Sequence, residues 1–209
     1  RGLQMLELGD FYVEKNRQQP WDLDGTPMSQ VFTGTVSNHP KLAEAARSTR
    51  GQLLHWKARP VLAYFHANSG GETERGGDVW PGGEAEYGYL RNVRTPWSES
   101  APFYRWSTNV GLRELAGLYS NLGRGAALTG LRVTNWSASR RARSFELDFS
   151  NGMSHTVDGN TFRLAVGAVR LPSLRLTVRR EGEKFHFEGT GFGHGVGLCQ
   201  WSAKVMAEH

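Results

Sequence analysis

Residues 144–157 have the sequence SFELDFSNGMSHTV, and this stretch indicates the fold class of the chain. Apolar side chains at every second position over residues 145–149 are typical of a half-buried strand. The dipeptide Asn151–Gly152 follows, and it favours the tight turn of a β-hairpin. A partner strand is therefore predicted over residues 155–157, antiparallel to the first.

The rest of the chain supports an α+β protein. Short strand-like runs are predicted at residues 31–32, 53–56, 61–66, 131–136, 174–178 and 184–188. Helical spacing of apolar residues predicts helices at residues 1–19, 41–49, 112–122, 161–169 and 200–208, with Asn160 as the cap of the fourth. Strands that return on themselves with few helices between them indicate mainly antiparallel sheets.

Composition limits the class of partner. The 209 residues carry a formal net charge of +5, with a pI near 9.6 and a mean hydropathy of −0.50. These values suit a globular protein, and the basic balance favours a polyanionic partner such as nucleic acid, an anionic lipid or an acidic wall polymer. The positive charge is dispersed apart from Arg140, Arg141, Arg143 and the pair Arg179–Arg180, so no nucleic-acid partner is expected. No apolar run has the roughly 18 residues needed to span a bilayer, so any membrane anchor is expected outside this chain.

The first chemically suggestive segment is AYFHANSGGETE, residues 63–74. A strand that ends in Asn-Ser-Gly-Gly can present backbone N–H groups and the hydroxyls of Ser69 and Thr73 around one concave point. Such a point suits a carboxylate or sugar hydroxyls. The alternative is that Ser-Gly-Gly only makes a tight turn.

The second segment is GTGFGHGVGLCQ, residues 189–200. Glycine at every second position lets another segment or a ligand approach one face of the chain closely. His194 is either a proton shuttle or a hydrogen-bonded anchor. The segment lacks the lysine of a P-loop and the βαβ context of a dinucleotide site, so neither is expected.

Serine hydrolase and metal sites are not favoured by the pattern. Ser69 is not in a Gly-x-Ser-x-Gly elbow. The seven histidines are scattered and Cys199 is the only cysteine, so no cofactor and no metal are expected.

Taken together, these segments resemble the stage II sporulation protein D family, which includes the LytB amidase enhancers. FHANSGGETE at residues 65–74 resembles the core block of that family, and GFGHGVGLCQW at residues 191–201 resembles its glycine–histidine block. Residues 158–163 and 171–173 resemble the helix and strand between the blocks, and residues 21–23 and 30–32 resemble the segment after the first helix of the family. The matches occur in the family's order over nearly the whole chain.

The resemblance implies an activity on peptidoglycan glycan strands. Members cleave between N-acetylmuramic acid and N-acetylglucosamine as lytic transglycosylases, leaving a 1,6-anhydro end; the alternative is a glycan-binding enhancer of a separate amidase. Such a transglycosylase uses one glutamate on its first helix, but Glu7 and Glu14 match no family motif, so no catalytic residue is assigned. The stretch at residues 21–30 has neither Cys nor His, so the zinc of some members is not expected.

The resemblance implies that the two blocks form the walls of one substrate cleft. The substrate contacts expected on these walls are His66, Ser69, Gly70, Gly71, Thr73, His194 and Gln200. We expect residues 1–209 to be one domain trimmed at both ends, with two closely packed lobes, 1–108 and 109–209, around the cleft. The expected location is extracytoplasmic.

Overall fold

The computed structural model describes Gln18, residues 40–80 and residues 82–209, and it divides the chain into two units, residues 1–64 and 65–209. In the first unit, helix α2 (Pro40–Ser48) precedes an antiparallel hairpin of strands β1 (His55–Trp56) and β2 (Arg59–Pro60). Proline suits the first helical turn because its φ is already set there. The helix predicted over residues 1–19 and the strand predicted at residues 31–32 lie outside the described residues. The predicted division into lobes after residue 108 stays a prediction.

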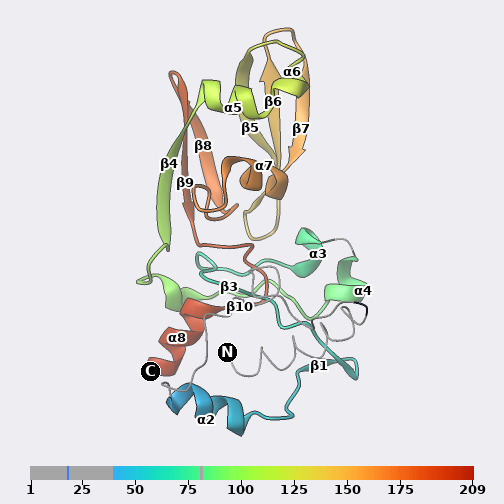
Figure 1. The fold of residues 1–209 in the computed structure, drawn as a ribbon, viewed down its shortest axis with the longest axis vertical. Helices are drawn as coiled ribbons and strands as arrows, with labels where there is room; N and C mark the ends of the chain where they lie inside the picture. The colour runs from blue at the N-terminus through green and yellow to red at the C-terminus, as the bar shows by residue number, and fades with distance from the viewer. Residues whose placement is uncertain (1–17, 19–39, 81) are drawn as a thin grey trace. The chain divides into compact units, whose positions relative to one another are not determined.

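Two antiparallel three-stranded sheets dominate the second unit (Figure 1). One has the order β4-β9-β8, formed by β4 (Arg105–Gly111), β9 (Lys184–Thr190) and β8 (Leu176–Glu181). The other has the order β5-β6-β7, formed by β5 (Leu128–Trp136), β6 (Ala142–Phe149) and β7 (Ser154–Asp158). Phe145 lies opposite Val157, which is the hairpin predicted from the alternation at residues 144–157. The predicted α+β fold with mainly antiparallel sheets is confirmed.

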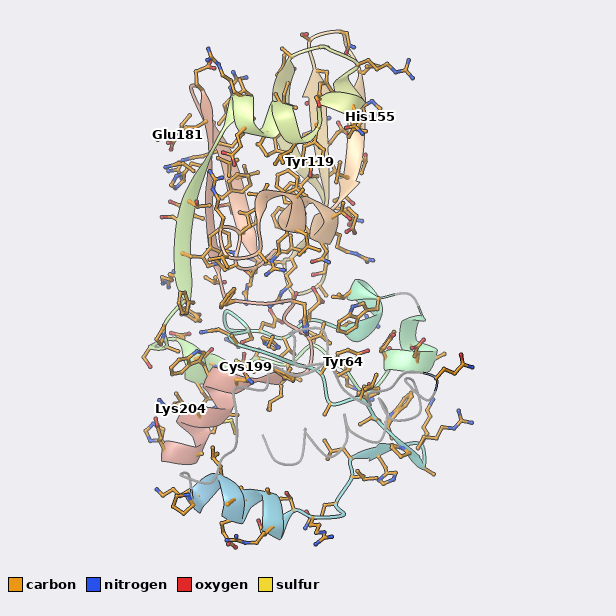
Figure 2. All side chains as sticks on the ribbon, viewed as in Figure 1. Tyr64, Tyr119, His155, Glu181, Cys199 and Lys204 are labelled. Atoms are coloured by element: carbon orange, nitrogen blue, oxygen red, sulfur yellow. The ribbon has the colours of Figure 1, made fainter. Side chains whose placement is uncertain are left out.

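Aromatic side chains join the two sheets around helix α7 (Gly159–Val166). The ring of Phe162 on α7 lies 4.1 Å from that of Phe145 on β6 and 6.2 Å from that of Phe187 on β9, measured between centroids. Tyr119, labelled in Figure 2, stacks on Phe162 at 5.9 Å. Helix α5 (Leu112–Leu118) adds Leu115 to the same core, and Leu122 of helix α6 (Ser120–Gly123) packs against it. Burial of these large apolar side chains stabilises this unit through the hydrophobic effect.

The structure corrects several details of the predicted elements; of the strand predicted at residues 61–66, only residues 65–66 form one. The cap of α7 is Asp158 and not Asn160, because the Asp158 carboxylate accepts the N–H of Thr161 at 2.9 Å. The helix predicted over residues 112–122 is interrupted at Tyr119, which separates α5 from α6. Strand β4 was not predicted, although Trp106, Thr108 and Val110 alternate with more exposed residues along it.

The remaining elements carry the two suggestive segments. Strand β3 (Phe65–His66) pairs in parallel with β10 (Leu198–Cys199), and helix α8 (Gln200–Glu208) starts directly after β10, with the predicted bounds. Between β3 and β4 lie short helices α3 (Gly76–Val79), α4 (Gly83–Tyr87) and η1 (Pro96–Ser98). Among the described residues, no helix has the length and apolar character needed to cross a membrane.

Candidate functional site

Backbone hydrogen bonds bring the serine–glycine turn and the glycine–histidine segment together. Asn68 and Phe192 exchange two bonds, 3.0 Å and 2.7 Å between nitrogen and oxygen, and the Glu74 N–H donates to the Gly195 carbonyl at 2.8 Å. These contacts join residues more than a hundred positions apart in the sequence. The two segments therefore form one structural unit.

The alternating glycines allow this close approach. A Cβ atom at Gly191 would lie 2.7 Å from the Asn68 carbonyl oxygen and 2.8 Å from the Gly70 nitrogen, and one at Gly193 would lie 2.9 Å from the Cβ of His66. Real Cβ atoms do not approach backbone so closely, so a side chain at Gly191 would separate the segments.

The hydroxyls of the turn point into the protein. Ser69 is fully buried, with its Oγ hydrogen-bonded to the Thr95 hydroxyl and its N–H donating to the Cys199 sulfur at 3.3 Å; Figure 2 labels Cys199 at the start of α8. Thr73 is also buried, and its hydroxyl donates to the Arg91 carbonyl at 2.9 Å and accepts from the Val93 N–H at 2.8 Å. Both hydroxyls thus hold the shape of the turn through internal hydrogen bonds.

The two histidines of the segments are neighbours, with ring centroids 5.8 Å apart. His66 is buried, and its Nδ1 donates to the Val196 carbonyl at 3.0 Å; burial lowers the pKa of His66 from 6.5 to about 4. The Nδ1 of His194 accepts the Val196 N–H at 3.0 Å. Burial, and then the positive charges of protonated His66 and of Arg141 and Arg163, lower the pKa of His194 from 6.5 to about 3. Both rings are therefore neutral near pH 7. Of the two roles that the sequence suggested for His194, its hydrogen bond to Val196 fits the structural anchor.

Arg141, from the turn between β5 and β6, supports the serine–glycine turn from behind. Its Nη2 donates to the Ser69 carbonyl at 2.7 Å and to the Glu72 carbonyl at 3.0 Å, and its Nη1 donates to the Ser139 hydroxyl at 2.7 Å. Burial lowers the pKa of Arg141 to about 10, while the charge of Glu74 opposes that shift. The guanidinium is thus charged at neutral pH.

Glu74 completes this buried network. Its carboxylate accepts hydrogen bonds from the hydroxyls of Ser137 and Ser139 and from the N–H of Arg75. The side chain is almost fully buried beside the charged Arg141. A carboxylate in this position offsets the cost of burying the guanidinium.

Replacing Glu74 by glutamine is therefore expected to lower the free energy of unfolding by about 2 kcal/mol, because one charge of the buried network disappears and the other stays. Denaturant unfolding measures the change, with the exposed Glu99→Gln as the matched control. Equal stability of the two variants would show that Glu74 does not stabilise Arg141.

A large open groove of about 880 Å³ lies beside the serine–glycine turn; we call it the aromatic groove. The Arg175 guanidinium lines it and donates to the Gly70 carbonyl at 2.9 Å, and Arg140 reaches it from a left-handed backbone conformation with φ of +60°. Aromatic rings and guanidinium groups characterise the lining, which consists of Gly70, Tyr104, Arg105, Trp106, Ser107, Trp136, Arg140, Arg175, Leu176, Thr177, Glu188, Gly189 and Thr190.

A second cavity of about 430 Å³, the small pocket, is lined by residues of α3, the β5–β6 turn and the start of α7. Its lining combines charged and aromatic groups: Glu74, Gly77, Asp78, Val79, Trp80, Asn135, Arg141, Ala142, Arg143, Ser144, Asp158, Gly159, Asn160, Arg163, Leu174, Gly193 and His194. In the part of the chain that the structure describes, no group of three or more His, Cys, Asp and Glu side chains could hold a metal ion.

The predicted contact residues are thus distributed over different environments. Gly70 lines the aromatic groove and His194 lines the small pocket. The side chains of His66, Ser69 and Thr73 are buried, whereas Gly71 and Gln200 are partly exposed outside both linings. Sequence reasoning missed Tyr104, Trp106, Trp136 and Arg175; the alternation along β4 was the available signal for Trp106.

Comparison with known proteins places this arrangement in a family. Residues 90–197 match the model of the domain of unknown function DUF8618. The chain is 27% identical over 200 residues to an uncharacterised protein of Brachyspira hyodysenteriae, covering 95% of this chain and 52% of that protein. It is 26% identical over 197 residues to stage II sporulation protein D of Bacillus subtilis, covering 89% of this chain and 54% of that protein. A protein of Bacillus subtilis named amidase enhancer is 21% identical over 225 residues, covering 88% of this chain and 32% of that protein.

The chain spans about half the length of the first two of these relatives. It belongs to the family of the domain of unknown function DUF8618 and is a member of the stage II sporulation protein D family.

Proposed function

We propose that this chain binds the glycan strands of bacterial peptidoglycan outside the cytoplasm, and that the full-length protein cleaves them as a lytic transglycosylase. The aromatic groove is the observation that carries the binding proposal. Sugar rings have apolar faces that pack on aromatic side chains, and Tyr104, Trp106 and Trp136 supply such surfaces. Its volume of about 880 Å³ lies within the usual range of ligand sites.

The polar groups of the groove match the polar edge of a glycan. Arg105, Arg140 and Arg175 offer N–H donors to sugar hydroxyls and carboxylates, while Glu188 offers an acceptor. Arg175 is fixed in place by the Gly70 carbonyl, so the serine–glycine turn orients part of the groove directly. This link gives the family block at residues 65–74 a role in binding.

Cleavage would follow the reaction implied by the family. A carboxylic acid protonates the glycosidic oxygen between N-acetylmuramic acid and N-acetylglucosamine, and the bond to the muramic anomeric carbon breaks. The conjugate base then takes the proton of the muramic 6-hydroxyl, whose oxygen bonds to that carbon and closes the 1,6-anhydro ring. We assign no described residue to the acid role.

Removing a groove aromatic tests the binding proposal. Trp136→Ala is expected to weaken retention on peptide-stripped glycan strands about tenfold, because a ring that packs on a sugar face is lost. Sedimentation with purified strands measures retention. Trp97→Ala is the matched control, since Trp97 is 46% exposed and Trp136 44%, and Trp97 does not line the groove. Equal retention of the two variants would rule out the groove as the binding surface.

A second candidate function is a non-catalytic enhancer that holds the glycan for a separate peptidoglycan amidase. The relative named amidase enhancer, which aligns with 88% of this chain, favours this candidate. It predicts that the full-length protein raises the rate at which a purified amidase releases stem peptides from intact sacculi, without shortening the strands. Trp136→Ala would then reduce the stimulation and leave the basal rate of the amidase unchanged.

A further inference from the structure

Phe103 has a backbone conformation that aromatic residues rarely adopt. Its φ is +63°, and among the residues that the structure describes it is the only aromatic one in the left-handed region. The Tyr104 N–H donates to the Ala101 carbonyl at 3.2 Å, so residues 101–104 form a β-turn with Pro102 in its second position and Phe103 in its third. A turn with a left-handed third residue usually has glycine there, because a Cβ atom in this conformation is sterically unfavourable.

Packing in the folded protein does not explain this strained residue. The Phe103 side chain is 58% exposed, and its ring lies 5.4 Å from that of Phe192, measured between centroids. Phe192 is itself only partly buried. Hydrophobic stabilisation is proportional to the apolar area removed from water, so a ring this exposed contributes little to folding. A strained residue that the fold does not need points to a role in binding.

The rings of Phe103 and Phe192, which we call the aromatic platform, lie next to residues of the aromatic groove. Phe103 directly precedes Tyr104, and Phe192 comes two positions after Thr190; Tyr104 and Thr190 both line the groove. The Gly191 N–H donates to the Tyr104 carbonyl at 2.9 Å, which joins the two segments at this point. The platform therefore continues the aromatic surface of the groove.

A cationic group accompanies this aromatic surface. The guanidinium carbon of Arg105 lies 5.6 Å from the centroid of the Tyr104 ring, and Arg105 is exposed and lines the groove. A sugar ring has an apolar face that packs on an aromatic ring and an edge of oxygen atoms that accept hydrogen bonds. An exposed ring with a nearby guanidinium therefore suits a sugar better than an apolar segment of another protein.

We propose that the aromatic platform is an additional sugar-binding subsite beside the aromatic groove, in which the apolar face of one sugar ring of a glycan strand packs on Phe103. This inference rests on the proposed function, because it assigns the subsite to the same strand that the groove binds. The strained turn keeps the ring exposed, where a strand can contact it.

Phe103→Gly tests the subsite, because it removes the ring and relieves the backbone strain together. We expect its Tm to stay within about 2 °C of the wild type, since the relief of strain offsets the lost contact with Phe192 and the greater freedom of glycine in the unfolded chain. Its retention on peptide-stripped glycan strands, measured by sedimentation, should fall about fivefold. Phe103→Tyr keeps the ring and should be retained like the wild type.

Leu164→Ala is the matched control for the loss of exposed apolar surface. Leu164, on α7, is 57% exposed and lines neither the aromatic groove nor the small pocket. Leu164→Ala should therefore be retained like the wild type. Trp136→Ala, measured in parallel, reports on the groove itself.

Three outcomes would overturn the inference. If Phe103→Gly is retained like the wild type while Trp136→Ala is weakened, strands bind the groove but not the platform, and the proposed function stands without the subsite. If Phe103→Gly lowers the Tm by more than about 5 °C, or Phe103→Tyr loses retention to the same extent, the phenylalanine supports the fold and not a sugar. Wild-type protein that is not retained on strands overturns the proposed function and the subsite with it.

Discussion

Gly191→Ala is expected to lower the free energy of unfolding by about 3 kcal/mol, because it forces apart the two segments that form the site. The backbone at Gly191 has φ of +87°, which L side chains rarely adopt. The new methyl group would also lie within 3 Å of backbone atoms of Asn68, Ser69 and Gly70, which cannot rotate away as a side chain can. Denaturant unfolding of the full chain measures the loss.

Gly182→Ala provides a control that separates the two causes. Gly182 has φ of +60°, so alanine there meets the same kind of backbone strain, but no atom lies within 4 Å of the point that its methyl group would occupy. We expect a cost of about 1 kcal/mol at this position. A similar cost for both variants would show that close packing between the two segments contributes little to stability.

Acidification from pH 7 to pH 4 is expected to destabilise the protein through His66 and His194. Burial lowers the pKa of His66 to about 4 and that of His194 to about 3, whereas both are near 6.5 in the unfolded chain. Between these values the unfolded chain binds protons that the folded chain does not, so stability falls as the pH falls through this window. For His66 alone, a shift from 6.5 to about 4 corresponds to about 3 kcal/mol, and His194 acts in the same direction.

Unfolding free energies at pH 7, 5 and 4 test this expectation. The double variant His66→Asn and His194→Asn removes the two imidazoles, so its stability should depend less steeply on pH over this range, whatever its stability at pH 7. The exposed His55→Asn is the control and should keep the wild-type slope. If the double variant retains the full slope, carboxylates and not these histidines cause the acid sensitivity.

Sequence patterns alone predicted elements in which one face is apolar and the other polar. The alternation at residues 145–149 and the Asn151–Gly152 turn predicted the β6–β7 hairpin, because strand side chains alternate between core and solvent. Alternating glycines at residues 191–197 predicted a close approach, and Gly191 and Gly193 do lie against Asn68 and His66. In both cases the signal is local and its physical cause is steric or hydrophobic.

The positions of the site side chains depend on contacts that local patterns do not contain. Ser69 faces inward because Thr95, Cys199 and Arg141, all distant in sequence, bind the turn. Arg140 and Arg141 are adjacent, yet the first lines the aromatic groove and the second is buried at the small pocket. Arg140 has a left-handed backbone conformation, and the two neighbouring side chains line different cavities. The composition of the sequence indicated only that basic residues cluster here.

The most direct test of the proposed function is to incubate the full-length protein with peptide-stripped glycan strands and to analyse bound and released material by mass spectrometry between about pH 5 and pH 8. We predict that strands are retained by the protein and that shorter products with 1,6-anhydro-muramic ends accumulate. Strands that are retained but not shortened would support the enhancer. If strands are neither retained nor shortened at any pH in this range, the proposal that this chain binds the glycan strands of the cell wall is contradicted.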